Sequence, residues 1–248
     1  MQAWIRNLVQ KFRYRITHTA KFPKGDLFSF LMNLADRGYQ PQHIVDVGAN
    51  KAKWSRKAHW VYPECRFTLV EPQIEMKPYL DKFCSRCKNA SWINAGVGDE
   101  MGELPLTVAP DTVSSSFAVS EQQANAVGYE RRTVPVITLD HLVKNVIKTI
   151  PDVVKIDAEG FEGKIMKGAS TLIGKTEMFL LEAPIIETPP EWQSLTELLV
   201  MMTDYGYEPY DFTTFQKRPR DGTVALTEVA FARREGILRS SNAAKRAA

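Results

Sequence analysis

Short runs of apolar, mostly β-branched residues alternate along the chain with longer stretches in which apolar residues recur at helical spacing. The short runs predict strands at 43–47, 66–70, 91–97, 153–156 and 178–181. The longer stretches predict helices at 26–38, 52–62, 74–88, 139–146 and 161–172. This alternation of strand and helix favours a parallel sheet with helices on both faces, which is a doubly wound α/β architecture.

The segment 100–137 interrupts this alternation. It holds two short strands, 104–108 and 133–137, with prolines that suit the edges of a sheet. Between them, Ser114-Ser115-Ser116-Phe117 predicts a loop. Two interpretations of this loop stay open: a solvated linker, or a lid whose hydroxyls donate hydrogen bonds to a ligand, because long loops in compact domains are often functional.

The C-terminal part adds one helix and two strands. The helix is expected to begin at Trp192 and to stop at Gly206, and the runs around 207–212 and 225–232 can pair as an antiparallel hairpin. We therefore expect a single doubly wound α/β domain with a mostly parallel seven-stranded sheet and an antiparallel last strand. An N-terminal helical extension precedes this domain.

Charge divides the chain into a domain at 26–232 and two basic ends. Residues 1–24 carry six Lys or Arg and no acid, and residues 233–248 carry five and one Glu, which leaves 21 basic and 28 acidic residues between them. An acidic body disfavours nucleic acid as a partner, although either end could contact phosphate. We expect 233–248 to be a disordered tail.

Residues 1–25 are expected to form a basic amphipathic helix. Its apolar stripe either makes a peripheral contact with an anionic membrane or packs on the domain, and both interpretations stay open. No apolar run approaches the roughly 20 residues that span a bilayer, and no secretory signal is recognisable. The expected location is therefore the cytoplasm.

Three cysteines raise the question of a metal site. Cys84 and Cys87 form a CxxC pair, and Cys65 stands apart. A structural zinc site usually has four ligands, and in the upstream sequence only His43 and His59 lie nearby. We expect the cysteines to be core residues instead, because Cys84 and Cys87 share one helical face with neighbouring apolar residues.

Acidic residues close the predicted parallel strands. They are Asp46, Glu71, Asp99, Asp157 and Glu182. In an open α/β sheet the ligand crevice lies beyond the carboxyl ends of the strands. A single acid there could simply cap a helix, but repetition at one edge predicts a ligand site. Lys155, inside the fourth strand, is expected to pair with one of these acids.

The turn after the first strand, Gly48-Ala49-Asn50, discriminates between cofactors. A dinucleotide-binding turn has the pattern G-x-G-x-x-G, because a pyrophosphate must approach backbone N–H groups closely. This turn has one glycine, which disfavours a nicotinamide dehydrogenase. A nucleoside without phosphates still fits, because Glu71 can accept hydrogen bonds from both ribose hydroxyls.

Several motifs together resemble those of the FkbM-type methyltransferases. In chain order they are Asp46-Val47-Gly48-Ala49-Asn50 with Trp54, Val70-Glu71-Pro72, Gly96-Val97-Gly98-Asp99, Thr138-Leu139-Asp140 and Lys155-Ile156-Asp157-Ala158-Glu159-Gly160-Phe161-Glu162. The resemblance covers residues 43–182 and is carried by the order and spacing of the set. The chain departs from the family at Ala52, where the family usually has glycine. The resemblance implies a Rossmann-like class I fold, S-adenosylmethionine as cofactor, and methyl transfer to an oxygen, often of a sugar or natural product.

The resemblance also implies which residues bind the cofactor. Glu71 would hold the ribose, the methionine part would lie against the turn that begins at Gly48, and the adenine would lie against 97–99. The full set is Asp46, Gly48, Asn50, Trp54, Glu71, Pro72, Val97, Gly98 and Asp99.

A hydroxyl that accepts a methyl group has to lose a proton. We hypothesise that Asp157 or Glu159 is the general base, or that Asp157 and Glu182 bind a divalent metal such as Mg²⁺, which would lower the pKa of the hydroxyl. The expected acceptor is a small molecule or glycan. Two alternatives stay open: a protein or RNA acceptor docked by the basic ends, and a non-catalytic binding protein that retains the fold.

Overall fold

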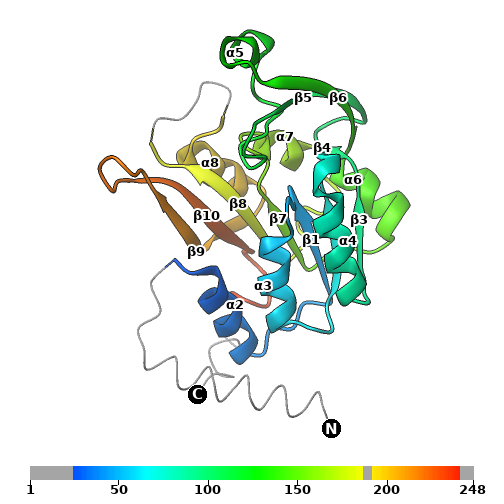
Figure 1. The fold of residues 1–248 in the computed structure, drawn as a ribbon. Helices are drawn as coiled ribbons and strands as arrows, with labels where there is room; N and C mark the ends of the chain where they lie inside the picture. Colours follow the sequence, from blue (N-terminus) through cyan, green and yellow to red (C-terminus); the bar gives the residue numbers. More distant parts are fainter. Residues whose placement is uncertain (1–24, 187–191, 241–248) are drawn as a thin grey trace.

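The computed structural model describes residues 25–186 and 192–240. Its main feature is a seven-stranded sheet in the order β3-β2-β1-β7-β8-β10-β9 (Figure 1). The strands are β1 (His43–Val47), β2 (Arg66–Val70), β3 (Ala90–Ile93), β7 (Val153–Ile156), β8 (Met178–Pro184), β9 (Tyr207–Lys217) and β10 (Val224–Arg233). The first five strands in chain order are parallel, and β10 is antiparallel to both β8 and β9. The predicted fold class is therefore confirmed.

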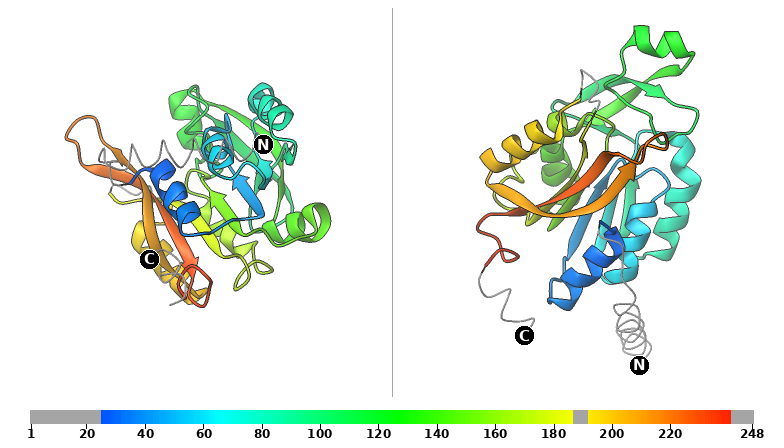
Figure 2. Two further views of the ribbon diagram at one scale, coloured as in Figure 1. Left: turned by 90° about the horizontal axis from the view of Figure 1, so that it is seen from below. Right: turned by 90° about the vertical axis from the view of Figure 1, so that its left-hand side faces the viewer.

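Helices cover both faces of this sheet, as Figure 2 shows. On one face lie α2 (Leu27–Asp36), α3 (Lys53–Val61) and, after a short 3-10 turn η1 (Ile74–Met76), α4 (Lys77–Arg86). On the other lie α6 (Leu139–His141) with its π-helical continuation η2 (Leu142–Ile147), α7 (Glu162–Lys167) and α8 (Leu195–Asp204). Each of these helices packs its apolar face against the sheet, and this packing on both faces gives the doubly wound arrangement.

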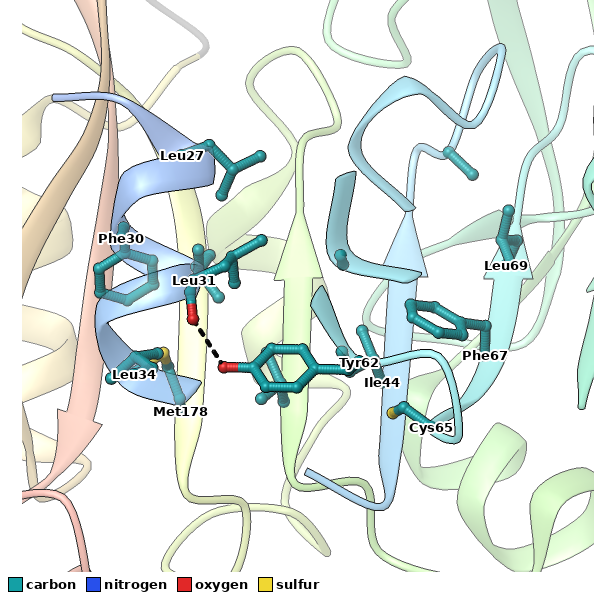
Figure 3. Close-up of a cluster of buried hydrophobic side chains, with 14 of the residues drawn as sticks. Leu27, Phe30, Leu31, Leu34, Ile44, Tyr62, Cys65, Phe67, Leu69 and Met178 are labelled. Carbon is teal, nitrogen blue, oxygen red and sulfur yellow. Dashed lines mark hydrogen bonds between the residues drawn. The ribbon is translucent and has the colours of Figure 1, made fainter. Parts of the chain in front are cut away.

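Strand β1 is buried on both sides because its side chains alternate between two apolar cores. Ile44 packs in the core beneath α2, α3 and α4, whereas Val45 and Val47 pack in the core beneath α6, α7 and α8. Figure 3 shows the first core, where the Tyr62 hydroxyl donates a hydrogen bond of 3.0 Å to the carbonyl of Leu31. Continuous apolar runs are typical of strands covered on both faces.

A second, three-stranded sheet rises beside the carboxyl ends of the parallel strands (Figure 1). It consists of β4 (Gly96–Val97), β5 (Gly102–Val108) and β6 (Glu130–Ile137), and α5 (Glu121–Val127) lies between β5 and β6 in the chain. The single strand predicted at 91–97 is thus wrong. The chain leaves the main sheet after Ile93, where the Asn94 side chain donates to the carbonyls of Glu71 and Pro72 at 3.0 Å each.

Two helices are shorter than their apolar spacing indicated. The helix predicted at 161–172 ends at Lys167, and turns follow. The last helix begins at Leu195 rather than at Trp192, because Ser194 caps it reciprocally with Glu197. In both cases the apolar residues at helical spacing extend beyond the residues that form the helix.

The segment predicted as a disordered tail is packed over its first eight residues. Arg233 ends β10, and the backbone N–H of buried Leu238 donates to the Glu177 carboxylate at 2.9 Å. Arg233 forms an ion pair with the same carboxylate at 3.2 Å. The prediction of disorder was therefore wrong for 233–240, because one partly buried acid and one leucine hold this segment against the domain.

The predicted amphipathic helix at 1–25 lies outside the described residues except for Gly25, and so do residues 241–248. Membrane contact through 1–24 therefore stays a prediction. Within the described part of the chain, no helix has the length and apolar character that crossing a membrane requires. The cysteines are free thiols; Cys65 and Cys87 are buried and Cys84 is half-buried, as expected of core residues.

Candidate active site

A cleft of about 580 Å³ lies at the carboxyl ends of β1, β2 and β7. The small sheet and the loop after β5 form its other wall, through Leu106, Val113, Ser115 and Phe117. Of the residues predicted to bind cofactor or to catalyse, the cleft brings together Gly48, Asn50, Glu71, Pro72, Val97, Asp157 and Glu159.

The turn after β1 needs glycine at its first position. Gly48 has a φ of +68°, and a Cβ there would lie 1.8 Å from the carbonyl oxygen of Asp157. The backbone N–H groups of Gly48 and Ala49 both donate to the Val70 carbonyl, at 3.0 and 3.3 Å. The first strand is thereby tied to the second at the floor of the cleft.

Asn50 and Ala52 continue this turn in the left-handed region, with φ of +44° and +52°. For a residue other than glycine this conformation costs roughly 1–2 kcal/mol. Ala52 is fully buried. Backbone geometry therefore explains why glycine would suit position 52, the one at which the chain departs from the family resemblance.

Glu71 follows β2 and is 2% exposed. Its carboxylate accepts hydrogen bonds from the backbone N–H groups of Asn50 at 2.7 Å and Gln73 at 2.9 Å, and from the Gln73 side chain at 3.2 Å. Burial raises the pKa of Glu71, and these hydrogen bonds oppose the rise. A carboxylate has about four acceptor positions, so Glu71 is held in place with capacity left for a ligand donor.

Lys155 is the buried cation behind the cleft, with a side chain 3% exposed. Its ammonium lies 3.1 Å from Asp46 and 3.2 Å from Asp157, and it donates to the Gly48 carbonyl at 3.0 Å. Burial lowers the pKa of Lys155, but the neighbouring carboxylates of Asp157 and Asp46 outweigh burial. The pKa of Lys155 therefore lies above its ordinary value. The predicted pairing of Lys155 with a strand-end acid is confirmed.

Asp46 consequently faces away from the cleft, and so does Trp54. The Asp46 carboxylate is fully buried between Lys155 and the Ser55 hydroxyl, which donates to it. The Trp54 indole N–H donates to Glu228 at 3.4 Å. Neither residue is among those that line the cleft, so both support it from behind.

Three carboxylates gather where the cleft meets the ends of β7 and β8. Asp157, Glu159 and Glu182 each offer an oxygen within 4.8 Å of the others. Burial, then Asp157 and Glu162, raises the pKa of Glu159 to about 8. Burial, then Asp157 and Glu159, also raises the pKa of Glu182, one of whose oxygens has no hydrogen-bond partner among the described residues.

The strand break after Ile93 decides which residues lie at the end of the cleft assigned to adenine. Val97 lines the cleft together with Ala95 and Gly96, but Gly98 does not and Asp99 is exposed. The expected acid at the end of the third parallel strand is therefore not at that strand end. Gly98 instead packs against Gly168, where a Cβ would lie 2.3 Å from the Gly98 carbonyl oxygen.

Sequence reasoning missed two polar residues near the carboxylates, Glu228 and Gln73. Glu228 of β10 lies opposite Glu182 in the strand register and accepts a hydrogen bond from Thr213. Burial raises the pKa of Glu228 to about 7. Gln73, also missed, connects Glu71 to the loop after β5. The signal that could have found Glu228 is an acid inside an otherwise apolar strand.

Solved structures with a similar fold include methyltransferases. The N-methyltransferase NodS from Bradyrhizobium japonicum, in complex with S-adenosylhomocysteine, aligns with a TM-score of 0.51 and 8% identity, over 84% of this chain and 86% of that one. Precorrin-6y C5,15-methyltransferase from Geobacter metallireducens aligns at 0.47 and 13%, over 83% and 87%. No curated protein matches the sequence significantly.

The seven-stranded sheet with its antiparallel β10 is the fold of a class I methyltransferase, and the cleft lies at the strand ends, where such a sheet places its ligand. Residues 46–209 match the sequence model of the methyltransferase FkbM domain. The chain belongs to this family. The match begins at Asp46, before the glycine turn, and it includes Glu71, the carboxylate cluster and the start of β9.

Proposed function

We propose that this protein transfers a methyl group from S-adenosylmethionine to a hydroxyl oxygen of a small molecule or glycan. The observation that carries the proposal is one cleft that is lined both by Glu71 and by the carboxylates of Asp157 and Glu159. A methyl donor and a group able to accept a proton would then be neighbours, and methyl transfer is accelerated chiefly by alignment and exclusion of water.

The residues present fit S-adenosylmethionine, which supplies an electrophilic methyl group on a sulfonium. Gly48 and Asn50, which line the cleft, would border its methionine part. Glu71 would accept from one ribose hydroxyl with its one remaining acceptor position. Val97, with Ala95 and Gly96, would border the adenine. The acidic lining also favours a cationic ligand.

Glu159 is the carboxyl that we assign to accept the hydroxyl proton. It lines the cleft, whereas Glu182 does not. Asp157 also lines the cleft, but its carboxylate is engaged in an ion pair with Lys155 at 3.2 Å. Asp157 would orient the acceptor instead.

A divalent metal such as Mg²⁺ is the second candidate for activating the hydroxyl. The carboxylates of Asp157, Glu159 and Glu182 provide oxygen atoms within 4.8 Å of one another, and Mg²⁺ prefers oxygen ligands. In this alternative Asp157 and Glu182 would hold the ion. Activity that is unchanged by a chelator would exclude it, and activity lost and restored by Mg²⁺ would favour it over a carboxylate base.

The acid-rich side of the cleft also bears on the acceptor. Among the described residues that line the cleft, Asp157 and Glu159 are acids and none is a Lys or Arg that could pair with a phosphate or carboxylate, so we propose a neutral or cationic acceptor. A protein or RNA acceptor docked by the basic ends would lose activity steeply with added salt. A neutral glycan would not.

Thermal unfolding with S-adenosylhomocysteine tests the cofactor assignment. We expect the ligand to raise the melting temperature of the wild type, because a ligand that binds only the folded state stabilises it. Glu71→Ala should reduce that rise strongly, whereas Glu64→Gln, an exposed acid before β2, should not. The absence of any rise in the wild type would instead support a non-catalytic binding protein.

Transfer of labelled methyl from S-adenosylmethionine to a panel of polyhydroxylated acceptors tests the reaction. With an accepted substrate, Glu159→Gln should lower kcat roughly 10²- to 10⁴-fold, the usual contribution of a general base. Full turnover by both Glu159→Gln and Asp157→Asn would refute the base assignment.

A further inference from the structure

The loop after β5 crosses the cleft from the cofactor side to the carboxylate side. We call residues 109–118 the serine loop, because three consecutive hydroxyls lie in it. Its chain is anchored in the small sheet, where the backbone N–H groups of Thr107 and Ser116 each donate to the other's carbonyl, at 3.1 and 3.0 Å. Beyond that anchor, its contacts divide between the two halves of the site.

On the cofactor side, the serine loop contacts the residues that hold Glu71. The Thr112 carbonyl accepts from the Asn50 side chain at 2.6 Å and from the Gln73 side chain at 3.0 Å. The Ser115 hydroxyl donates to the Gln73 side-chain oxygen, also at 3.0 Å. The Gln73 side chain thus bonds both to the loop and to Glu71, whereas Asn50 bonds to the loop through its side chain and to Glu71 through its backbone N–H.

On the carboxylate side, the contact is made by Ser116, which is 2% exposed. Its hydroxyl donates to the backbone carbonyl of Glu159 at 2.6 Å and accepts from the Ala118 N–H at 2.9 Å. Glu159 has a φ of +50°, a left-handed conformation that a glutamate adopts only where its surroundings hold it. The Ser116 hydroxyl is one of the groups that hold it.

We propose that Ser116 is a positioning residue for Glu159, and that Ser115 and Ser116 together connect an occupied cofactor seat to the placement of that carboxylate. Ligand bound at Glu71 holds Gln73, Gln73 holds the serine loop through Ser115, and the loop holds the Glu159 backbone through Ser116. The inference rests on the proposed function for the identity of the ligand and the role of Glu159.

Three adjacent serines allow a matched test. Ser114 is exposed, and its hydroxyl donates to Asp111 within the serine loop at 2.9 Å. Ser114→Ala therefore removes the same group from the same loop without touching either half of the site. Ser115→Ala should weaken the cofactor side, and Ser116→Ala should release Glu159.

Hydrogen–deuterium exchange of the full chain, with and without S-adenosylhomocysteine, measures the link without a known acceptor. In the wild type the ligand should slow exchange in peptides from both the serine loop and 157–161. In Ser116→Ala with ligand bound, the 157–161 peptide should exchange roughly two- to tenfold faster than in the wild type, the factor for one lost hydrogen bond. The serine loop should stay protected.

The other variants complete the test. Ser115→Ala should weaken S-adenosylhomocysteine binding by a similar factor, and Ser114→Ala should behave as the wild type. Ser116→Thr, which keeps the hydroxyl, should restore protection of 157–161. Peptides from α2 serve as the reference, because general destabilisation by a substitution would accelerate exchange there as well.

The two possible failures are distinguishable. If ligand protects the wild-type cleft but Ser116→Ala leaves 157–161 unchanged, or if Ser114→Ala reproduces its effect, the positioning role is overturned and the proposed function stands. If S-adenosylhomocysteine protects nothing in the wild type, the proposed function and this inference are both overturned.

Discussion

At the scale of single residues, backbone conformation limits the turn after β1 more than side-chain chemistry does. Gly48, Asn50 and Ala52 all have positive φ, and a Cβ at position 48 would also collide with the Asp157 carbonyl. The turn can therefore bring two strands and a ligand together, provided that no Cβ intrudes at position 48.

Replacing Gly48 tests this requirement. Gly48→Ala should lower the free energy of unfolding by well over the roughly 1–2 kcal/mol of left-handed strain, because its Cβ would also collide with the Asp157 carbonyl. Gly38→Ala is the control, since Gly38 has a φ of +86° with nothing described within 4 Å of a Cβ. Urea denaturation of both variants measures the difference. Equal losses would contradict the close contact.

His43 is a second residue whose surroundings set its chemistry. It is buried at the start of β1, with one ring nitrogen 3.0 Å from the Thr68 hydroxyl and the other 2.8 Å from the Arg66 guanidinium. Burial, assisted by Arg66, lowers the pKa of His43 to about 4. The imidazole is therefore neutral in the folded protein at neutral pH.

The pH dependence of stability follows from this lowered pKa. Between the unfolded pKa of about 6.5 and the folded pKa of about 4, the unfolded chain binds a proton that the folded one does not. The contribution of His43 to stability is thus complete above pH 6.5 and falls as the pH drops, by up to roughly 3 kcal/mol. The difference in unfolding free energy between the wild type and His43→Gln should shrink accordingly. A difference independent of pH would contradict the shift.

At the scale of elements, the pairing of β1 with β7 places opposite charges side by side. Asp46 and Lys155 are partners in the strand register. Asp157 follows Lys155 by two residues, directly after the end of β7. One ammonium therefore compensates two carboxylates at the point where both strands end. This arrangement fixes Asp157 at the cleft.

Removing that ammonium should be costly. Lys155→Met leaves Asp46 buried without its counter-charge, and we expect a loss of about 3–5 kcal/mol in unfolding free energy. The double variant with Asp46→Asn should recover part of it. Lys77→Met, which breaks an exposed ion pair with Asp81, should change stability by less than about 1 kcal/mol. Similar effects from both lysines, measured by denaturation, would refute the buried pair.

At the scale of the whole molecule, the last described segment, residues 233–240, packs against the domain. Leu238 is 6% exposed and lies in the core with α2, although the sequence around it is basic. Its neighbour Ile237 is 62% exposed. A leucine and its backbone contact with Glu177 thus order a stretch that composition alone marks as a tail.

These adjacent residues supply the test. Leu238→Ala should cost about 2–4 kcal/mol in unfolding free energy, as for other buried leucines. Ile237→Ala should change it by no more than about 0.5 kcal/mol. If both variants unfold at the wild-type urea concentration, the segment is not part of the folded core.

Local patterns were sufficient for most of the scaffold. The parallel strands were predictable because each is a continuous apolar run between helical stripes. Glu71 and Asp157 could be predicted to lie at the cleft because they directly follow such runs. The third strand was misjudged, since apolar residues resume after Asn94 and this one polar residue was not taken as the point where the chain changes sheets. Asp99 was accordingly placed at a strand end that it does not occupy.

The sequence by itself determined the α/β class, the glycine turn, the acids that follow the strands and the family, because all of these depend on residues near one another in the chain. The tertiary structure alone decided that Glu228 joins the carboxylates from β10, that Asp46 and Trp54 support the cleft from behind, and that the serine loop reaches Glu159. The physical reason is that these contacts join distant segments. They depend on strand order, on the break between the two sheets and on side-chain packing, and none of these produces a periodic pattern of apolar residues in the sequence.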